Sequence, residues 1–464
     1  MGRHRFDRTR VGGSRRSWRA HQVTAAIDAA VASCGAGVGR PAPHLVAPLA
    51  AGTVVDGPGG PASDPAPGAD GGARLVDRAL ARALVEAVAG AWRIGWQPAD
   101  VHRAVARQRG RTHARLVARA IACDAAGHGP ADLPPRWRLQ LDAIGAGAGD
   151  TPGADSRATG AWVRVARSGG GTDRTSAVVV AVEALATLRR LPRMPKLGPA
   201  PGDPAPPPGR GRAAVAGEGV GADPRVLHRV TALLAKAEST TFPDEAEALT
   251  AKAQALMTRH AIDRATVDAR AGRAPGAAVG GRRLGLDDPY AGARYLLLSV
   301  VADANRCRAV WSKYWGFATV FGDEGDLDAV ELLYSSLLVQ ATRAMVAEGP
   351  TRRSGTGRGA GGAGAGGGGG RTRSFRQSFL VAFGRRIGAR LHEAAAAATA
   401  AEAGRGTALV PLFAARRRAA DEAVAAAYPD VGTTRMSAND AAGWHAGTAA
   451  ASRAQIDLHG ALRR

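Results

Sequence analysis

Three stretches rich in glycine and proline set the strongest limit on how this chain can fold. They run from Gly35 to Gly72, from Leu191 to Gly221 and from Gly355 to Gly370. Such sequences cannot bury enough apolar surface to offset the chain entropy that folding removes. We therefore predict linkers for the first two stretches and a flexible loop for the third. We therefore expect more than one core in the 464 residues.

These breaks divide the chain into five predicted segments. Residues 1–73 are expected to be a basic arm and a disordered linker, and residues 147–222 mostly linker with a candidate helix at 174–190. Ordered structure is expected in a helical bundle at 74–146, a helical hairpin at 223–268 and an α+β domain at 287–464. The predicted fold class is mainly α, with a small α+β domain at the C-terminal end.

The segment at 74–146 has the periodicity of short helices. Apolar residues recur at helical spacing from Leu75 to Val88, a second helix opens at Pro98, and Gly110 separates it from a third. Short helices with tight turns and many arginines are compatible with a helix-turn-helix that places one helix in a major groove. A structural bundle with solvated arginines explains the same residues. We favour the bundle, because no helix stands out as a recognition helix.

Apolar spacing, capping and helix breaks all agree between Asp223 and Asp263. One face of the first predicted helix is apolar, comprising Val226, Leu227, Val230, Leu233, Leu234 and Ala237. The pattern breaks at Ser239 to Phe242, and Thr241 and Pro243 are typical of the start of a second helix. That helix carries its own stripe, comprising Ala246, Leu249, Ala253, Leu256 and Met257. The short connection predicts two antiparallel, packed helices. Lys236, Glu238, Ser239, Glu245 and His260 are the polar positions available for a site, and capping and solvation explain them more simply.

The region from Tyr290 to Val346 predicts a helix, a β-hairpin and a second helix. Apolar residues dominate 290–302, and residues 306–312 and 317–322 alternate like two strands joined at Lys313 to Gly316. An acidic cluster, Asp323, Glu324, Asp326 and Asp328, precedes the second helix. Its oxygens suit magnesium or calcium. Complementing the helix dipole and capping the helix account for it better, so we expect no metal and no cofactor.

Two family resemblances follow from these residues. The run VLHRVTALLAKAESTTFPDEAEALTAKAQALMTRHAID resembles the domain of unknown function 2786, found in bacterial and phage proteins. The positions that carry the match are Leu233, Leu234, Ala235, Ala237, Ser239, Thr240, Glu245, Ala246, Ala253, Leu256 and Ile262. The later segments FGDEGDLDAVELLY and SFRQSFLVAFGRRI resemble its companion, the domain of unknown function 7168. Neither family has an assigned activity, so the resemblance implies an architecture and no chemistry.

A helix beyond the glycine loop combines an apolar face with a basic one. Phe375, Phe379, Phe383, Ile387 and Leu391 share the apolar face. The candidate nucleic-acid-binding residues are Arg376, Arg385, Arg386 and Arg390 on this helix, with Trp311, Tyr314 and Trp315 at the hairpin. Arginines contact phosphates and aromatic rings stack on bases. Core packing of the aromatic residues is the alternative. Further along, Gly443 and Gly447 are four residues apart, which predicts a close helix contact.

The charge favours an anionic partner. The formal net charge is +22 and the isoelectric point is near 11.3, values typical of proteins that bind nucleic acid. Lysine occurs only at positions 196, 236, 252 and 313, and arginine supplies the remaining basic residues, so a GC-rich coding bias is an alternative cause. Cys34, Cys123 and Cys307 form no metal or redox motif. With no apolar leader and no run of roughly 18 apolar residues, a cytoplasmic protein without membrane contact is expected.

Known catalytic motifs do not match the sequence. The run LHEAA at 391–395 begins like a zinc-protease helix, but Ala396 occupies the position of the second histidine. Phosphate-binding loops and nucleophile elbows do not match either. The function we favour is a nucleic-acid-associated accessory protein with DNA or RNA as partner. The alternative is a structural or interaction module that docks another protein through its helical surfaces, and the third hypothesis is a hydrolase without a recognisable motif.

Overall fold

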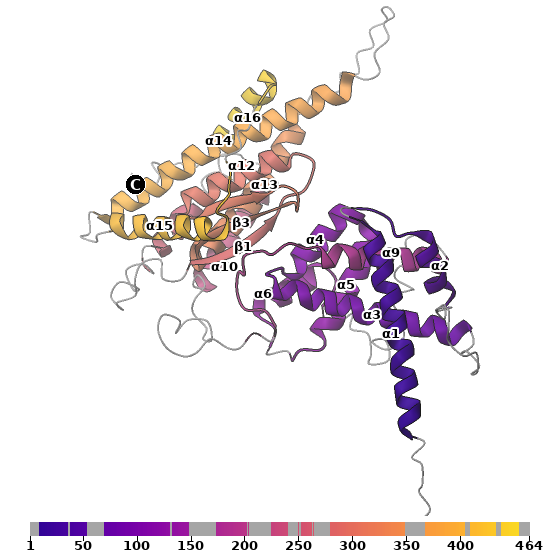
Figure 1. Ribbon diagram of the computed structural model, residues 1–464. Coiled ribbons are helices and arrows are strands. Elements are labelled where there is room, and N and C mark those ends of the chain that lie inside the picture. The colour runs from indigo at the N-terminus through magenta and orange to yellow at the C-terminus, as the bar shows by residue number, and fades with distance from the viewer. Residues whose placement is uncertain are drawn as a thin grey trace, which may run out of the picture. The chain divides into compact units, whose positions relative to one another are not determined.

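The computed structural model describes the following residues: 9–35, 38–52, 69–129, 132–147, 173–201, 203, 224–239, 249, 252–261, 263, 279–348, 367–403, 409–432 and 438–453. The chain forms two compact units, Met1–Pro204 and Ala205–Arg464. Both are mostly helical, and the C-terminal unit also contains a three-stranded antiparallel sheet (Figure 1). The predicted fold class, mainly α with a small α+β part at the C-terminal end, is confirmed.

The N-terminal unit is a bundle of helices. Its described helices are α1 (Thr9–Ser33), α2 (Pro43–Ala51), α3 (Ala69–Arg93), α4 (Pro98–Arg109), α5 (Arg111–Ala125), α6 (Pro135–Ala143) and α9 (Arg174–Arg189). The bundle predicted at 74–146 corresponds to α3 to α6, and the candidate helix at 174–190 is α9. Residues 181–188 of α9 are all buried, so α9 lies in the core of the unit.

Helix α5 is also largely buried, which bears on the helix-turn-helix hypothesis. Eight of its fifteen residues are buried, including Leu116, Val117 and Ile121. A recognition helix must present its face to a groove, whereas α5 packs against α3, α4 and α9. Gly110 alone joins α4 to α5, with a φ of +91°, where a glycine is favoured. These observations favour the structural bundle.

The segments expected to be linkers are partly ordered. Within residues 1–73, α1 and α2 are helices that bury Val23, Ile27 and Leu49. Their apolar residues are spaced at helical intervals among alanines, and this spacing outweighs the local basic charge. In the next predicted linker, Met194 N donates to Ile94 O at 2.8 Å, and Trp96 Nε1 donates to Pro192 O at 2.7 Å. The cores of the predicted linkers, residues 53–68 and 204–223, lie outside the described residues, as does 349–366.

The C-terminal unit combines the sheet with helices. Its elements are α10 (Pro224–Ser239), β1 (Val279–Gly285), α12 (Ala291–Ala304), β2 (Arg308–Ser312), β3 (Phe317–Asp323), α13 (Glu324–Ala347), α14 (Gly367–Ala403), α15 (Leu409–Ala427) and α16 (Ala441–Arg453). Residues 252–261 are helical as well. The predicted helix, hairpin and helix correspond to α12, β2–β3 and α13. Thr241 and Pro243, predicted at the start of the second hairpin helix, lie outside the described residues.

The sheet has the strand order β1-β3-β2, with both pairs antiparallel. Residues 317–322 of the central strand β3 are all buried. Ala318 and Val320 belong to the core formed with α12 and α13. The opposite face meets α15 and the residue after it, since Thr319 Oγ1 lies 2.9 Å from Tyr428 OH. Strand β1, VGGRRLG, lacks alternating apolar residues and is an edge strand, which explains why sequence periodicity does not reveal it.

Helices α14 and α16 pack side by side (Figure 1). A methyl group added at Gly443 would lie 2.3 Å from Phe375 O, and one added at Gly447 would lie 2.2 Å from Phe379 O. Contacts this short admit only glycine. The close helix contact predicted from the spacing of these two glycines is therefore confirmed.

Candidate functional site

Three of the four arginines predicted on the basic face of α14 make contacts with α16. Arg390 is buried, and its Nη1 donates to Ala451 O at 2.7 Å near the C-terminal end of α16. Arg386 Nε donates to Ser452 Oγ at 3.3 Å, and the Arg385 guanidinium lies 5.6 Å from the centre of the Trp444 ring. Arg376 is half-buried. Because cations are favoured at helix C-termini, Arg390 acts here as a cap for α16, while Arg385 and Arg386 keep exposed side chains.

The predicted aromatic residues occupy a different environment, around the β2–β3 hairpin. Trp311 stacks on Tyr295 of α12, with ring centres 5.3 Å apart. Tyr314 is 61% exposed at the turn and meets the edge of Trp315, with ring centres 4.7 Å apart. Trp311 thus fits the packing alternative, and Tyr314 remains open to a ligand. The structure does not gather the seven predicted residues into one cluster: Arg385, Arg386 and Arg390 contact α16, whereas Trp311 contacts α12 and Tyr314 contacts Trp315.

The carboxylates of the acidic cluster at the start of α13 cap the helix or bind arginine side chains. Asp323 accepts a hydrogen bond from Gly325 N at 3.1 Å and caps the helix. Arg282 of β1, itself buried, donates to three carboxylates of α13, those of Glu324, Asp328 and Glu331, at 2.6–3.0 Å. The contact of Asp323 confirms the capping interpretation for that residue, and the ion pairs with Arg282 add a role that was not predicted. Within the described part of the chain, no group of three or more histidine, cysteine or acidic residues is arranged to hold a metal ion.

Next to this cluster lies a buried ion pair between Arg306 and Asp326. Arg306 Nη2 lies 2.5 Å from Asp326 Oδ1, and the Arg306 guanidinium lies 4.6 Å from the centre of the Phe413 ring. Burial disfavours the charge of Arg306, but the contacts with Asp326, together with the nearby Cys307 and Asp323, outweigh it and raise the pKa of the guanidinium. Burial likewise raises the pKa of the Cys307 thiol well above its usual value. This thiol therefore stays protonated and unreactive at neutral pH.

A small pocket adjoins this ion pair. The predicted hairpin contributes Val226, Val230, Met257 and His260 to its wall, and Asp323 and Arg416 line the other side. The volume that the centre of a water molecule can occupy in it is about 20 Å³, which is room for about one water. The pocket is therefore too small for an organic substrate, and we assign it a role in packing.

Two buried polar residues of the hairpin fix how it docks on the rest of its unit. Gln254 and Thr258 are fully buried, and Gln254 Nε2 lies 3.3 Å from both Thr258 Oγ1 and Asn305 Oδ1. Sequence reasoning did not select either residue. The sequence feature that could have revealed Gln254 is its position next to Ala253 of the apolar stripe.

The structure also places polar positions of this segment that the sequence offered for a site. Ser239 Oγ donates a hydrogen bond to Lys236 O at 3.1 Å, the main-chain oxygen of Glu238 accepts one from Arg343, and His260 lines the pocket. Glu245 lies outside the described residues.

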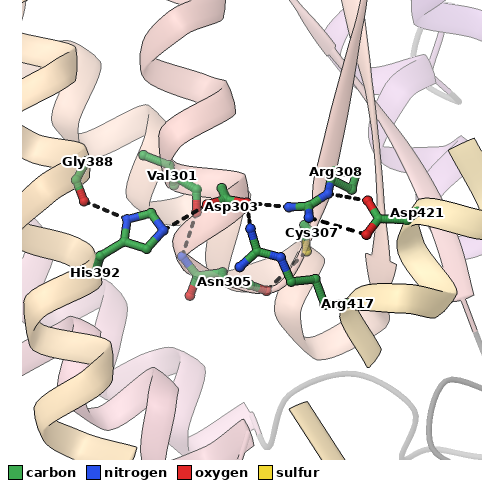
Figure 2. A network of polar contacts seen from close by, with 9 residues as sticks. All are labelled: Val301, Asp303, Asn305, Cys307, Arg308, Gly388, His392, Arg417 and Asp421. Atoms are coloured by element: carbon green, nitrogen blue, oxygen red, sulfur yellow. Dashed lines mark hydrogen bonds and ion pairs between the residues drawn. The ribbon is translucent and has the colours of Figure 1, made fainter. Parts of the chain in front are cut away.

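A partly exposed polar network surrounds Asp303 (Figure 2). Its carboxylate accepts from Arg308, from Arg417 Nη2 at 2.5 Å and from His392 Nε2 at 2.8 Å, while Arg308 also binds Asp421. The other ring nitrogen, His392 Nδ1, lies 2.8 Å from Gly388 O. His392 is the histidine of the LHEAA run, and both its nitrogens face acceptors from the protein. The network therefore joins α12, β2, α14 and α15, and it leaves no ring nitrogen for a metal.

In the N-terminal unit, Glu183 is buried among basic partners. Glu183 Oε2 lies 2.8 Å from His113 Nε2, and Glu183 Oε1 lies 3.7 Å from Arg109 Nη1. Arg109 also donates to Val38 O and Gly39 O at 3.0 and 3.1 Å. Burial raises the pKa of the nearby Cys34 thiol. These contacts anchor the connection between α1 and α2 to the core.

Comparison with known proteins finds a match for one segment of the chain. A family model described as Protein of unknown function (DUF2786) matches residues 225–264. The resemblance predicted for this hairpin is confirmed. No curated protein and no solved structure matches the chain.

The matched segment is an integral part of the C-terminal unit. Helix α10 packs on α13, and Gln254 reaches Asn305 after α12. None of the helices in the described ranges is both long and apolar enough to cross a membrane.

Proposed function

We propose that this protein is a nucleic-acid-associated accessory protein. The supporting observation is that many of its described carboxylates serve internal contacts. They bind arginine, histidine or tryptophan side chains or cap helix N-termini, and they are Asp28, Asp77, Asp124, Asp173, Glu183, Asp303, Asp323, Glu324, Asp326, Asp328, Glu331, Asp421 and Asp440. Other arginines, among them Arg385 and Arg386, are exposed at the surface, where phosphates are accessible.

In the C-terminal unit, the proposed contacts are the exposed arginines of α14 and the hairpin turn. Arg385 and Arg386 are adjacent in sequence and both exposed. Tyr314 presents an exposed ring beside the exposed Lys313, a combination suited to stacking on an unpaired base. Asp287 and Asp288 follow β1, whose end is joined to this turn by Leu286 N donating to Gly316 O at 2.8 Å. Because these carboxylates oppose phosphate binding at the turn, we assign the main electrostatic contact to the arginines.

The docking alternative has less support. It requires an exposed apolar stripe on the hairpin at 223–263. Val230, Leu234, Ala237, Ala253 and Met257 of this stripe are buried within their own unit. A partner would have to displace that packing.

Affinity for DNA measured over a range of salt concentrations tests the proposal. We expect the full chain to bind single- and double-stranded DNA with an affinity that falls steeply as salt rises. The double variant R385Q/R386Q should bind at least about tenfold more weakly at low salt. The slope of the logarithm of its affinity against the logarithm of salt concentration should be shallower by about two. The control R373Q/R418Q removes the same charge from exposed positions on α14 and α15 and should change affinity less than about threefold.

Two results would contradict the proposal. If the unmodified chain shows no binding to DNA or RNA at low salt, or binding that salt does not weaken, the function is rejected. If both double variants weaken binding equally, the contact at Arg385 and Arg386 is rejected.

We also propose that residues 287–464 correspond to the companion domain of unknown function 7168. The order α12, β2, β3, α13 and the later α14 agrees with the order of the segments that carry the resemblance. An experimental structure of an established companion domain is the test. A different order of these elements along the chain would contradict the assignment.

A further inference from the structure

Helix α3 of the N-terminal unit has an exposed row of arginines that sequence analysis did not select. Arg74, Arg78 and Arg82 follow one another at intervals of four residues and are all exposed. In an α-helix this spacing places three side chains on one face, about 6 Å apart along the axis. The opposite face packs into the unit through Val76, Leu80 and other apolar residues. The helix therefore holds the three guanidinium groups in a line.

The charge of this row is not neutralised within the described residues. Arg74, Arg78 and Arg82 make no ion pair there, and the nearest carboxylate in sequence, Asp77, is held by Arg174 Nη2 at 2.7 Å. Glu86 continues the row one turn further and is exposed. The face keeps three positive charges against one negative charge. A linear anion with repeated charges is the complementary partner.

The other side chains of α3 indicate how such a ligand would be recognised. Sequence is read in DNA grooves by Asn and Gln as well as Arg, with Ser and Thr as further donors. Helix α3 contains no Asn, Gln, Ser or Thr, and the apolar neighbours of the arginine row include Leu75, Ala79 and Ala81. Phosphate contacts fix position without carrying sequence information. The small side chains of Ala79 and Ala81 also let the backbone of a nucleic acid approach the helix closely.

We propose that the exposed face of α3, through Arg74, Arg78 and Arg82, binds the phosphodiester backbone of nucleic acid independently of its sequence. The ligand class rests on the proposed function, but the site is separate from Arg385 and Arg386 in the other unit. Each arginine contacts one phosphate. The row contributes affinity and orientation, and it provides no base selection.

Fluorescence anisotropy of the full chain with two labelled duplexes of unrelated sequence tests this inference. The triple variant R74Q/R78Q/R82Q should bind at least about tenfold more weakly. The slope of the logarithm of its affinity against the logarithm of salt concentration should be shallower by about three, because each phosphate contact contributes roughly 0.9 to that slope. The matched control R93Q/R138Q/R193Q removes three exposed arginines that form no such row and should weaken binding less than about threefold. Unmodified protein should bind both duplexes within about threefold of one another. Circular dichroism and thermal unfolding of each variant confirm that the fold is retained.

Several outcomes overturn the inference. Equal losses in the two triple variants reject the row as the site, and affinities that differ by more than about thirtyfold between the duplexes reject sequence independence. Inorganic polyphosphate that binds more tightly than DNA at equal total charge rejects nucleic acid as the ligand. A chain that binds DNA through Arg385 and Arg386 but is unaffected by the α3 triple variant rejects this inference alone. Complete absence of binding rejects the proposed function as well.

Discussion

At the scale of single residues, Asp124 illustrates a carboxylate whose charge is costly in the folded state. Its Oδ2 accepts a hydrogen bond from Trp92 Nε1 at 2.8 Å. Burial raises the pKa of Asp124 above its usual 3.8, and the contacts with Trp92 and His128 offset this only in part. The folded state therefore binds the proton more tightly than the unfolded state. The stabilisation linked to this group is complete below the unfolded pKa and is lost as pH rises through the folded pKa.

We predict that Asp124→Asn makes the protein more stable at about pH 7. The amide removes the buried charge, and its oxygen still accepts the bond from Trp92. The gain should disappear at about pH 3, where the carboxyl of the parent protein is protonated in both states. Urea unfolding at both pH values measures the difference, with Glu86→Gln on the exposed face of α3 as the control. A variant that is less stable at neutral pH would show that the charge itself stabilises the bundle.

At the scale of helices, the contact between α14 and α16 depends on two glycines. Any side chain at Gly447 would meet the backbone oxygen of Phe379, which cannot move without displacing its helix. At Gly384 of α14, an added methyl group would lie 3.5 Å from Leu297 Cα and N, at ordinary contact distance. The same substitution should therefore have opposite effects at these two helical positions.

We predict that Gly447→Ala lowers the free energy of unfolding by about 2 kcal/mol or more, as overpacking does in well-packed cores. Gly384→Ala should be neutral or stabilise by up to about 1 kcal/mol, because alanine favours the helix. Denaturant unfolding monitored by circular dichroism compares the two variants. Equal stability of both would mean that α16 does not pack on α14 at this distance.

At the scale of the whole molecule, the chain forms two compact units, each with its own buried core. We predict that calorimetry of the full chain resolves two unfolding transitions. Asp124→Asn should shift only the transition of the N-terminal unit, and Gly447→Ala only that of the C-terminal unit. One cooperative transition that both substitutions move would contradict two independently unfolding units.

Much of the fold follows from local patterns in the sequence. Helical spacing predicts α3, α10 and α14, strand alternation predicts β2 and β3, and the two glycines predict the contact with α16. Strand β1 and helix α1 were not predicted. β1 is stabilised by pairing with β3 rather than by its own side chains, and the basic N-terminal residues obscured the apolar spacing of α1. Both depend on partners distant in sequence, which local periodicity does not contain.

The candidate site likewise combines features that the sequence determines with features that only folding determines. Sequence alone determined which residues are basic, which faces are apolar, and that residues 225–264 match the model of a known family. Only the tertiary structure decided how each charge is used. Arg390, predicted to meet phosphates, caps α16, whereas Arg74, Arg78 and Arg82 remain exposed and unpaired within the described residues. An arginine has the same charge at every position. Its availability for a ligand depends on the carbonyls and carboxylates that folding brings within hydrogen-bonding distance.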